Sequence, residues 1–246
     1  MKAGFSFLLV LLAVPALWQI IVWVFEPKPA FLPPPAMVAG VLWSERTSLL
    51  GHTFTTLSEA VIGYAIANAI AFGLAVFFFH VRGAERVATP WLVVLKNVPF
   101  PTVASILVVV MGDSLGPKLI IVVLVTFFPI LANLNKGLKS VDPGLVDRMR
   151  TLHATRWQIF SKAAWPASLP YYIAAHEIAF TGSIIAAIVA EWLFAQRGLG
   201  FLIVQASTQF RTDRLFAVTI VASGLAMLAY ALVGLAERHV LRWQRA

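Results

Sequence analysis

Residues 53–79 read TFTTLSEAVIGYAIANAIAFGLAVFFF, and Glu59 is the single charged residue among them. A helix needs about 20 mostly apolar residues to cross the hydrocarbon core of a bilayer. The stretch therefore predicts a membrane-spanning helix. The whole chain agrees, because 60% of its 246 residues are hydrophobic and 12% are charged, about half the charged fraction of a soluble domain.

Five other apolar stretches predict further spans, at residues 5–25, 87–111, 119–134, 171–194 and 215–235. Prolines interrupt the stretch at 87–111. The first stretch could be a cleaved signal peptide, since Val14-Pro15-Ala16 offers small residues. However, the apolar run continues through residues 17–24, which favours an uncleaved span. The fold class expected is all-α, with about six transmembrane helices.

The chain divides into two parts on composition. Residues 1–50 hold the first span, a proline-rich outer segment and an amphipathic surface helix expected at 36–50. Residues 51–246 hold the remaining spans and a polar, basic loop at about 135–169. The side with both termini, counting Lys2 and the tail beyond residue 237, has twice as many Lys and Arg residues as the other. The richer side is expected to be cytoplasmic.

Several chemistries are absent from this sequence. The chain has no Cys, which excludes disulfides and thiolate ligands. Its five His residues are scattered without zinc-site spacing, and it has no nucleotide-binding Gly-x-x-x-x-Gly-Lys-Ser/Thr motif. The net charge of +8 could suggest nucleic acid, but cytoplasmic loops explain it better. We therefore expect no enzyme activity, metal, cofactor or nucleic-acid partner.

The loop at 135–169 has the pattern of short amphipathic helices. Asp142 can cap a helix whose first turn contains Pro143, and a second short helix is expected to end at Pro166 and Pro170. The apolar residues Leu145, Met149 and Leu152 line one face of the first helix, while Asp147, Arg148 and Arg150 face elsewhere. Such a helix can dock into a groove on a soluble partner or lie on the lipid surface.

The loop sequences DRMRTLHATRW at 147–157 and WPASLP at 165–170 resemble the conserved cytoplasmic loop of ABC-importer permeases. The most similar branch is the sulfonate, taurine and nitrate type, which includes pyrimidine-precursor permeases. Other matches follow in the right order over about residues 30–245: Pro33-Pro34-Pro35, residues 52–57 with Gly63, residues 127–130 with Gly137-Leu138, and Ala190-Glu191-Trp192 with Gly198-Leu199-Gly200.

The resemblance implies a type I ABC importer permease core at residues 51–246. Two permease subunits, expected as a homodimer in the bacterial inner membrane, would line a central path. Each inner loop would dock on one of two ABC ATPase subunits, which bind the ATP, and a periplasmic or lipid-anchored solute-binding protein would deliver solute. The residues expected to dock on the ATPase are Asp142, Leu145, Asp147, Arg148, Met149, Leu152, His153, Arg156 and Trp157.

Three positions depart from the family pattern in this loop. The family glycine falls on His153, and the two family alanines fall on Arg148 and Met149. Glycine would permit a positive φ or a close approach to the partner, and His adopts left-handed geometry more readily than most residues. Docking is therefore expected to differ in detail or to involve a distinct ATPase, and a degenerate, non-transporting copy is an alternative.

Polar residues inside the expected spans are candidates for the solute path: Glu59, Lys96, Asn97, Pro99, Pro101 and Glu177. A charge at mid-membrane costs roughly 2.5–3.5 kcal/mol, so Lys96 should face protein or water. It would line the path or pair with a nearby carboxylate. Pro99 and Pro101 support the path, because broken helices are tolerated at the border of a cavity.

Glu59 and Glu177 stand where the resembling branch commonly has arginine. This reversal favours a neutral or cationic heterocycle, such as a pyrimidine, over a sulfonate-like anion. The alternative is that both make packing contacts with Lys96 or backbone donors. Glu191 matches a family glutamate but could be structural. A membrane enzyme would need clustered catalytic groups, and an ATP-independent secondary transporter or channel would need paired intramembrane carboxylates and no docking loop.

Overall fold

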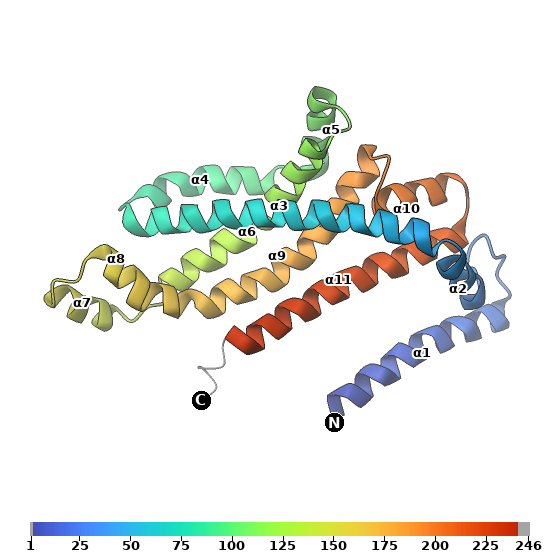
Figure 1. Cartoon of the computed structure of the whole chain (residues 1–246), viewed down its shortest axis with the longest axis horizontal. Helices are drawn as coiled ribbons and strands as arrows, with labels where there is room; N and C mark the ends of the chain where they lie inside the picture. Colours follow the sequence, from blue (N-terminus) through green and yellow to red (C-terminus); the bar gives the residue numbers. More distant parts are fainter. Residues whose placement is uncertain (1, 241–246) are drawn as a thin grey trace.

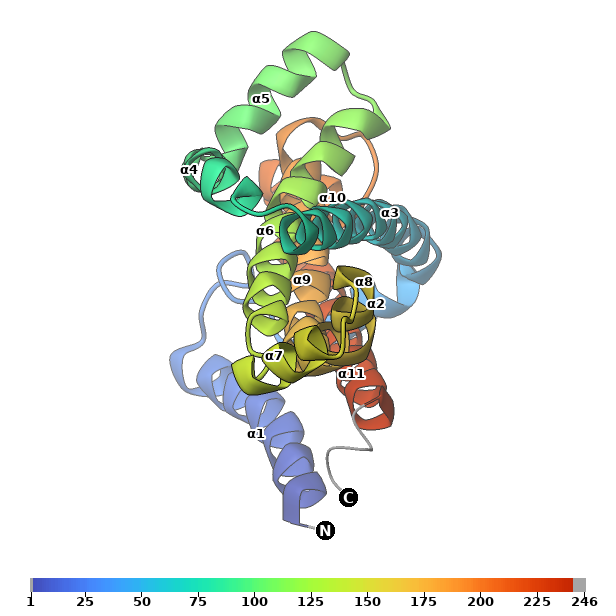
Figure 2. The same ribbon diagram turned by 90° about the vertical axis from the view of Figure 1, so that its left-hand side faces the viewer.

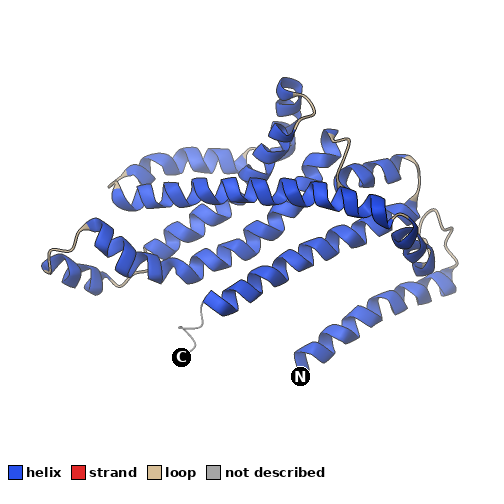
Figure 3. Cartoon of the chain, viewed as in Figure 1, coloured by secondary structure: helices blue, strands red, loops and turns tan. Residues whose placement is uncertain are grey.

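A computed structural model describes the backbone of residues 2–240 and the side chains of residues 13–237. Within residues 2–240 every regular element is a helix (Figure 3). The expected all-helical membrane fold is confirmed. The side chains of Lys2 and of the basic residues beyond Glu237, which entered the charge argument, lie outside the described residues.

The helices follow one another in this order: α1 Lys2–Phe25, α2 Pro35–Ser44, α3 Arg46–His80, α4 Ala84–Asn97, α5 Phe100–Met111, α6 Leu115–Leu138, α7 Pro143–Thr151, α8 Arg156–Ile159, the π-helical segment η1 Phe160–Ala164, α9 Trp165–Phe194, α10 Leu199–Thr208 and α11 Thr212–Val240.

Four uninterrupted helical stretches are long and apolar enough to cross a membrane: Arg46–His80, Leu115–Leu138, Arg156–Phe194 and Thr212–Glu237. The pair α4 and α5 makes a fifth, bent by 84° at the break between the two helices. The break falls at Val98 and Pro99, where the proline pattern predicted an interruption. The first expected span is α1, whose described side chains cover the apolar stretch Ala13–Phe25.

Helices α6 and α9 pack along each other and form the centre of the bundle, with α3 lying across both (Figure 1). Leu131, Leu134 and Leu138 of α6 are buried in one cluster with Ala71 and Ala75 of α3. Helix α11 packs on α9, and α1 extends away from the bundle (Figures 1 and 2). Helices α7 and α8 lie at one end of the molecule, and α2 and α10 at the other (Figure 1).

Two expected boundaries near the α2 end are wrong. The surface helix expected at 36–50 ends at Ser44, and α3 begins at Arg46, so the domain boundary expected at residue 50 falls inside α3. The break coincides with Glu45, which forms ion pairs with Arg211 and Arg214. The segment between the spans expected at 171–194 and 215–235 contains α10, which is stabilised by burial of Leu199 and Leu202. Both features depend on tertiary contacts that local sequence does not reveal.

The prolines at 166 and 170 do not end the helix, contrary to the sequence prediction. Helix α8 continues through η1 into α9, and Pro166 lies in the first turn of α9. Because the helix is continuous here, Pro166 lies inside it, directly after η1, where the Trp165 N–H already donates to the Phe160 carbonyl in the wider π-helical pattern. Pro170 lies further inside α9. Burial of the preceding Phe160 and Ala164 against α3 and α6 holds the continuous helix in place.

Candidate functional site

Helix α7 is the least buried helix of the polar loop. Asp142 caps it as predicted, because its side chain accepts a hydrogen bond of 2.9 Å from the Gly144 N–H. None of the nine residues of α7 is buried. On its apolar face Leu145 is exposed, Met149 is half-buried, and Leu152, just after the helix, is 80% exposed. The apolar face is therefore open over most of its length.

Helix α8, in contrast, is fixed to the bundle. Thr155 and Gln158 form a capping box at its start. The Arg156 guanidinium donates a hydrogen bond to the His80 carbonyl oxygen at the end of α3. The Trp157 ring lies 5.8 Å from the His80 ring and 5.3 Å from the Phe160 ring. The loop thus combines an open helix with a second helix anchored to a long span.

His153 adopts a left-handed conformation with φ of 59°. The His153 N–H donates to the Arg150 carbonyl at 2.9 Å, and the Ala154 N–H donates to the Met149 carbonyl at 2.9 Å. This pair of bonds is a Schellman motif, in which glycine is the usual left-handed residue. Of the two reasons given for a glycine at this position, a positive φ and a close approach to the partner, the structure shows the positive φ, which His153 adopts.

The break between α4 and α5 brings four of the predicted path residues together. Lys96 and Asn97 end α4, Pro99 precedes α5, and Pro101 lies in its first turn. The Asn97 amide donates to the Val93 carbonyl of its own helix at 2.7 Å. All four residues are exposed in the single chain.

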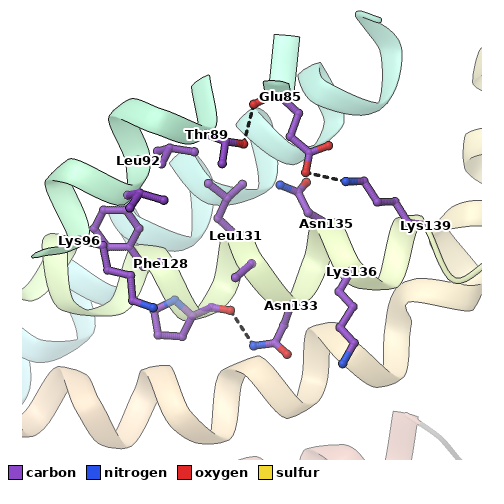
Figure 4. Close-up of a pocket in the computed structure, with 13 residues that line it drawn as sticks. Glu85, Thr89, Leu92, Lys96, Phe128, Leu131, Asn133, Asn135, Lys136 and Lys139 are labelled. Atoms are coloured by element: carbon purple, nitrogen blue, oxygen red, sulfur yellow. Dashed lines mark hydrogen bonds and ion pairs between the residues drawn. The ribbon is translucent and has the colours of Figure 1, made fainter. Parts of the chain in front are cut away.

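A groove of about 680 Å³ runs between α4 and α6 and includes Lys96 (Figure 4). Its polar side chains include Lys96, Lys136, Lys139, Asn133 and Asn135. Lys139 pairs with Glu85 at 2.6 Å, whereas Lys96 has no ion pair among the residues whose side chains are described. A second groove of about 290 Å³ also includes Lys96 and continues toward α5. Lys96 is therefore an available cation at the boundary of two hollows.

Glu59 does not line either groove. It is 3% exposed and forms an ion pair of 3.1 Å with Lys118 of α6. Asp113 lies 3.9 Å from the same ammonium group. This burial favours the packing alternative for Glu59, with Lys118 rather than Lys96 as its partner. Lys118 escaped the sequence analysis because it directly precedes the apolar stretch at 119–134, although it lies in the first turn of α6.

Glu177 has a different environment on α9. It is half-buried, and within residues 13–237 no hydrogen bond or ion pair to its side chain is observed. Ala174, one turn earlier, and Ile178 beside it are both exposed. A carboxylate on such a face of a membrane helix needs water or a second protein chain beside it.

Glu191 is the centre of a buried polar network near the start of α10. It is 1% exposed, accepts from the Thr56 hydroxyl at 2.7 Å, and accepts from the Gly200 N–H at 2.7 Å. The Thr56 hydroxyl oxygen also accepts from the Leu199 N–H at 2.8 Å. A Cβ on Gly200 would overlap the Ile188 carbonyl oxygen. Glu191 therefore has a structural role, which was one of the two readings of the sequence.

Residues 67–242 match the family described as "Binding-protein-dependent transport system inner membrane component". The chain belongs to this family. It is the permease subunit of a binding-protein-dependent ABC importer, as the sequence predicted.

Relatives of this permease are named for several solutes. It is 32% identical to the formylaminopyrimidine transport permease protein ThiX of Halalkalibacterium halodurans, over 89% of this chain and 88% of the relative. It is also 32% identical to the riboflavin transport system permease protein RibX of Chloroflexus aurantiacus, over 88% and 82%. The putative aliphatic sulfonates permease SsuC of Escherichia coli is 28% identical over 94% and 89%.

The fold of the permease is also that of a solved transporter. The inward-facing MetNI methionine ABC transporter aligns with a TM-score of 0.68 and 16% identity, over 81% of this chain and 97% of that one. An amino acid ABC transporter with histidines aligns with a TM-score of 0.66 and 16% identity, over 80% and 96%. At these identities the likeness establishes the fold.

Two polar clusters of the permease escaped the sequence reading. Tyr64 and His176 share a hydrogen bond of 2.7 Å beside an apolar groove between α3, α9 and α11. At the α10 end, Arg211 pairs with Glu45 and Asp213, each at 3.0 Å. The hydrogen bond to Asp213 raises the pKa of the Arg211 guanidinium above its ordinary value. Each cluster joins helices far apart in sequence, so no local spacing could have revealed it.

Proposed function

We propose that this permease works as a homodimer that carries a small heterocyclic solute into the cytoplasm, driven by two copies of a separate ABC ATPase. The permease itself binds no nucleotide, and a periplasmic or lipid-anchored binding protein delivers the solute. Membership of the binding-protein-dependent family supports the ATPase and binding-protein partners. The observation that carries the proposal is the open apolar face of α7 on a loop that is anchored to the bundle.

The ATPase docks on the loop through α7. Leu145, Met149 and Leu152 supply an apolar face, and Asp142, Asp147, Arg148, His153, Arg156 and Trp157 surround it. A helix that exposes such a face can be received by a groove on a folded partner. Because α8 holds the loop to the end of α3 through Arg156 and Trp157, movement of the ATPase cleft is transmitted to the bundle.

The α7 end is the cytoplasmic end in this proposal, and both termini are cytoplasmic. Three described basic residues of the loop support this orientation: Arg148, Arg150 and Arg156 are all exposed. Basic residues are retained on the cytoplasmic side during membrane insertion. The division into an N-terminal segment and a permease core remains part of the proposal, with the core beginning at α3.

The solute path follows the break between α4 and α5. Lys96, Asn97, Pro99 and Pro101 lie at the break, and Glu177 faces outward from α9. In the dimer, water or the second copy lies beside the exposed face of α9 and beside the α4–α6 groove. This explains why Lys96 and Glu177 remain unpaired in a bundle of apolar helices. Glu59 is assigned to packing rather than to the path, because it is buried with Lys118.

A heterocycle is the preferred solute class, with a sulfonate-like anion as the alternative. Two relatives at 32% identity are named for formylaminopyrimidine and riboflavin, and a relative at 28% is named for aliphatic sulfonates. In the groove, Asn133, Asn135 and Lys96 can donate hydrogen bonds to ring carbonyls, and Phe128 offers an aromatic face. Lys96 could equally receive an anion, so uptake must decide between the two classes.

The test is purification of the complex from cells that express the complete importer. We expect the ATPase to accompany the wild-type permease and to be lost from a Leu145→Asp, Met149→Asp, Leu152→Asp variant. Ser161→Asp is the matched control, because Ser161 is exposed on the same loop but outside α7. ATP-dependent uptake of a labelled pyrimidine by vesicles would support the solute class, and uptake of sulfonate alone would reject it. Transport without ATP by the permease alone would favour a secondary transporter.

A further inference from the structure

Phe210, like Glu26 and His153, is a non-glycine residue that adopts a positive φ at the end of a helix. It follows α10 with φ of 55°. Its N–H donates to the Ser207 carbonyl at 3.1 Å, and the Arg211 N–H donates to the Ala206 carbonyl at 2.9 Å. The motif is the same Schellman arrangement as at His153. An aromatic residue with this φ is a true conformational outlier, and glycine would avoid the strain.

The Phe210 ring makes no buried contact within residues 13–237 that would offset the strain of its backbone. It is 87% exposed, and among residues 13–237 it belongs to no buried apolar cluster and to no close aromatic pair. Strained residues that persist are concentrated at functional sites. The ring is more exposed than the other exposed phenylalanines among residues 13–237, of which Phe31 at 76% comes next.

The segment that presents Phe210 is firmly held. Arg211 forms ion pairs with Glu45 and Asp213, and the Thr212 hydroxyl donates to the Ala30 carbonyl. Two separate parts of the chain, at Glu45 and at Ala30, thus hold the turn. A ring held in place by its backbone loses little conformational entropy on binding, which is the property of an interface anchor.

The cytoplasmic loop provides an internal comparison. His153 has the same left-handed geometry at the end of α7, in the loop that is proposed to dock on the ATPase. It too is exposed. Helix α10, which Phe210 follows closely in the chain, lies at the end of the bundle opposite α7 (Figure 1). If the strained residue at one end marks a contact with a partner, the corresponding partner at the other end is the solute-binding protein.

The charged residues beside α10 indicate which charge a partner's surface should carry to bind there. Arg211 and Arg214 are neutralised by Glu45 and Asp213. Arg197, just before α10, is exposed and has no carboxylate within 4.0 Å among the described side chains. It borders a polar hollow of about 270 Å³ that also includes His52. The face therefore offers an apolar ring at one end of α10 and a free cation at the other.

We propose that the face along α10, from Arg197 to Phe210, is where the importer's solute-binding protein docks. Phe210 inserts into an apolar pocket of that protein, and Arg197 meets a carboxylate at its rim. This assignment rests on the proposed function, because it requires a binding-protein-dependent importer with α10 at the outer end. It adds the contact residues and the chemistry of the partner surface.

The test uses the permease–ATPase complex in lipid nanodiscs and the purified solute-binding protein of the same importer. Phe210→Gly removes the ring and the strain together, so we expect unchanged or higher thermal stability and unchanged basal ATPase activity. Affinity for the binding protein should fall by about tenfold or more, as for loss of an interface anchor. Phe77→Ala is the control, since Phe77 is an exposed phenylalanine at the far end of α3.

The outcomes separate this proposal from the function on which it rests. If the solute-binding protein does not stimulate the ATPase activity of the wild-type complex, the importer proposal itself fails. If wild type is stimulated and Phe210→Gly binds equally tightly, the docking face is overturned and the importer stands. If Phe210→Asn, which tolerates positive φ, behaves like Phe210→Gly, loss of the ring rather than a changed turn is the cause, which supports the docking face.

A label at this position distinguishes the binding protein from lipid. The chain has no Cys, so Phe210→Cys gives a single labelling site for an environment-sensitive dye. Shielding of the dye when binding protein is added would support the docking face. Quenching by brominated lipids that binding protein does not alter would overturn it, because residue 210 would then lie in the bilayer.

Discussion

The two ends of the bundle differ in how far their polar and apolar groups are buried. Near α10, Glu191, Thr56 and the Gly200 amide satisfy one another in a buried network, and Glu59 pairs with Lys118. At the other end, α7 buries none of its nine residues and leaves Leu152 80% exposed. The buried network near α10 is satisfied within the single chain, whereas the apolar face of α7 is left open.

This difference separates residues that maintain the fold from residues that await a contact. A buried polar group that loses its hydrogen-bond partner lowers the free energy of unfolding, so substitutions in the buried networks of Glu191 and Glu59 should act on stability. An exposed side chain contributes little to the folding of its own chain, so substitutions in α7 should act on assembly. The following predictions test that division, from the largest expected effect to the smallest.

Gly200→Ala should have the largest effect on folding. The added Cβ would overlap the Ile188 carbonyl, which is backbone and cannot move aside. We expect a loss of more than about 4 kcal/mol, which is diagnostic of a core clash, seen as poor expression and a much lower melting temperature in detergent. Gly73→Ala is the control, because a Cβ there meets open space; an equal loss in both variants would contradict the prediction.

Lys118→Ala should come next, because it leaves Glu59 buried without its cation. Removing one partner of a buried pair costs about 3–5 kcal/mol. The double variant Glu59→Gln, Lys118→Met should recover much of the loss, since neither charge then remains buried. Thermal melting of the three proteins gives the comparison. Equal stability of the single and double variants would show that the pair is not coupled.

His153→Gly should stabilise the isolated permease slightly. Glycine relieves the left-handed strain but gains freedom in the unfolded chain, so we expect a net gain of about 0.5 kcal/mol in chemical denaturation. Association with the ATPase should change at the same time, because the imidazole lies beside the docking face. Substantial destabilisation would mean that the His153 side chain packs within the loop.

Leu152→Ala should have the smallest effect on stability. The side chain is already exposed, so its loss should change the unfolding free energy by less than about 0.5 kcal/mol. ATPase retention during purification should nevertheless fall. If stability falls and retention does not, Leu152 belongs to the fold and the contrast between the two ends is wrong at this position.

Much of the site was predictable where the signal is local. The Asp142 cap and the left-handed turn at His153 depend on hydrogen bonds within about four residues, so residue types at fixed spacing reveal them. The prolines at 99 and 101 marked the break between α4 and α5 for the same reason. The Glu59–Lys118 pair joins residues 59 positions apart, and no spacing rule could identify it.

The prolines at 166 and 170 show how packing can overcome a local signal. Alone they predict a helix end, but burial of neighbouring apolar residues against α6 holds η1 and α9 in one continuous helix. Helix α10 is the reverse case. The sequence placed this segment between two expected spans, and it is helical because Leu199 and Leu202 are buried, the Thr56 hydroxyl oxygen accepts from the Leu199 N–H and Glu191 accepts from the Gly200 N–H.

The sequence by itself determined that this is a helical membrane protein of the permease family, and where most of its spans and its polar loop lie. Those properties follow from hydrophobic length, charge bias and ordered motifs, which are written along the chain. Only the tertiary structure decided which charges are buried together and which faces stay open. Those properties depend on which distant helices touch, since a carboxylate such as Glu59 or Glu177 becomes a packing group or an available one according to the cation placed beside it.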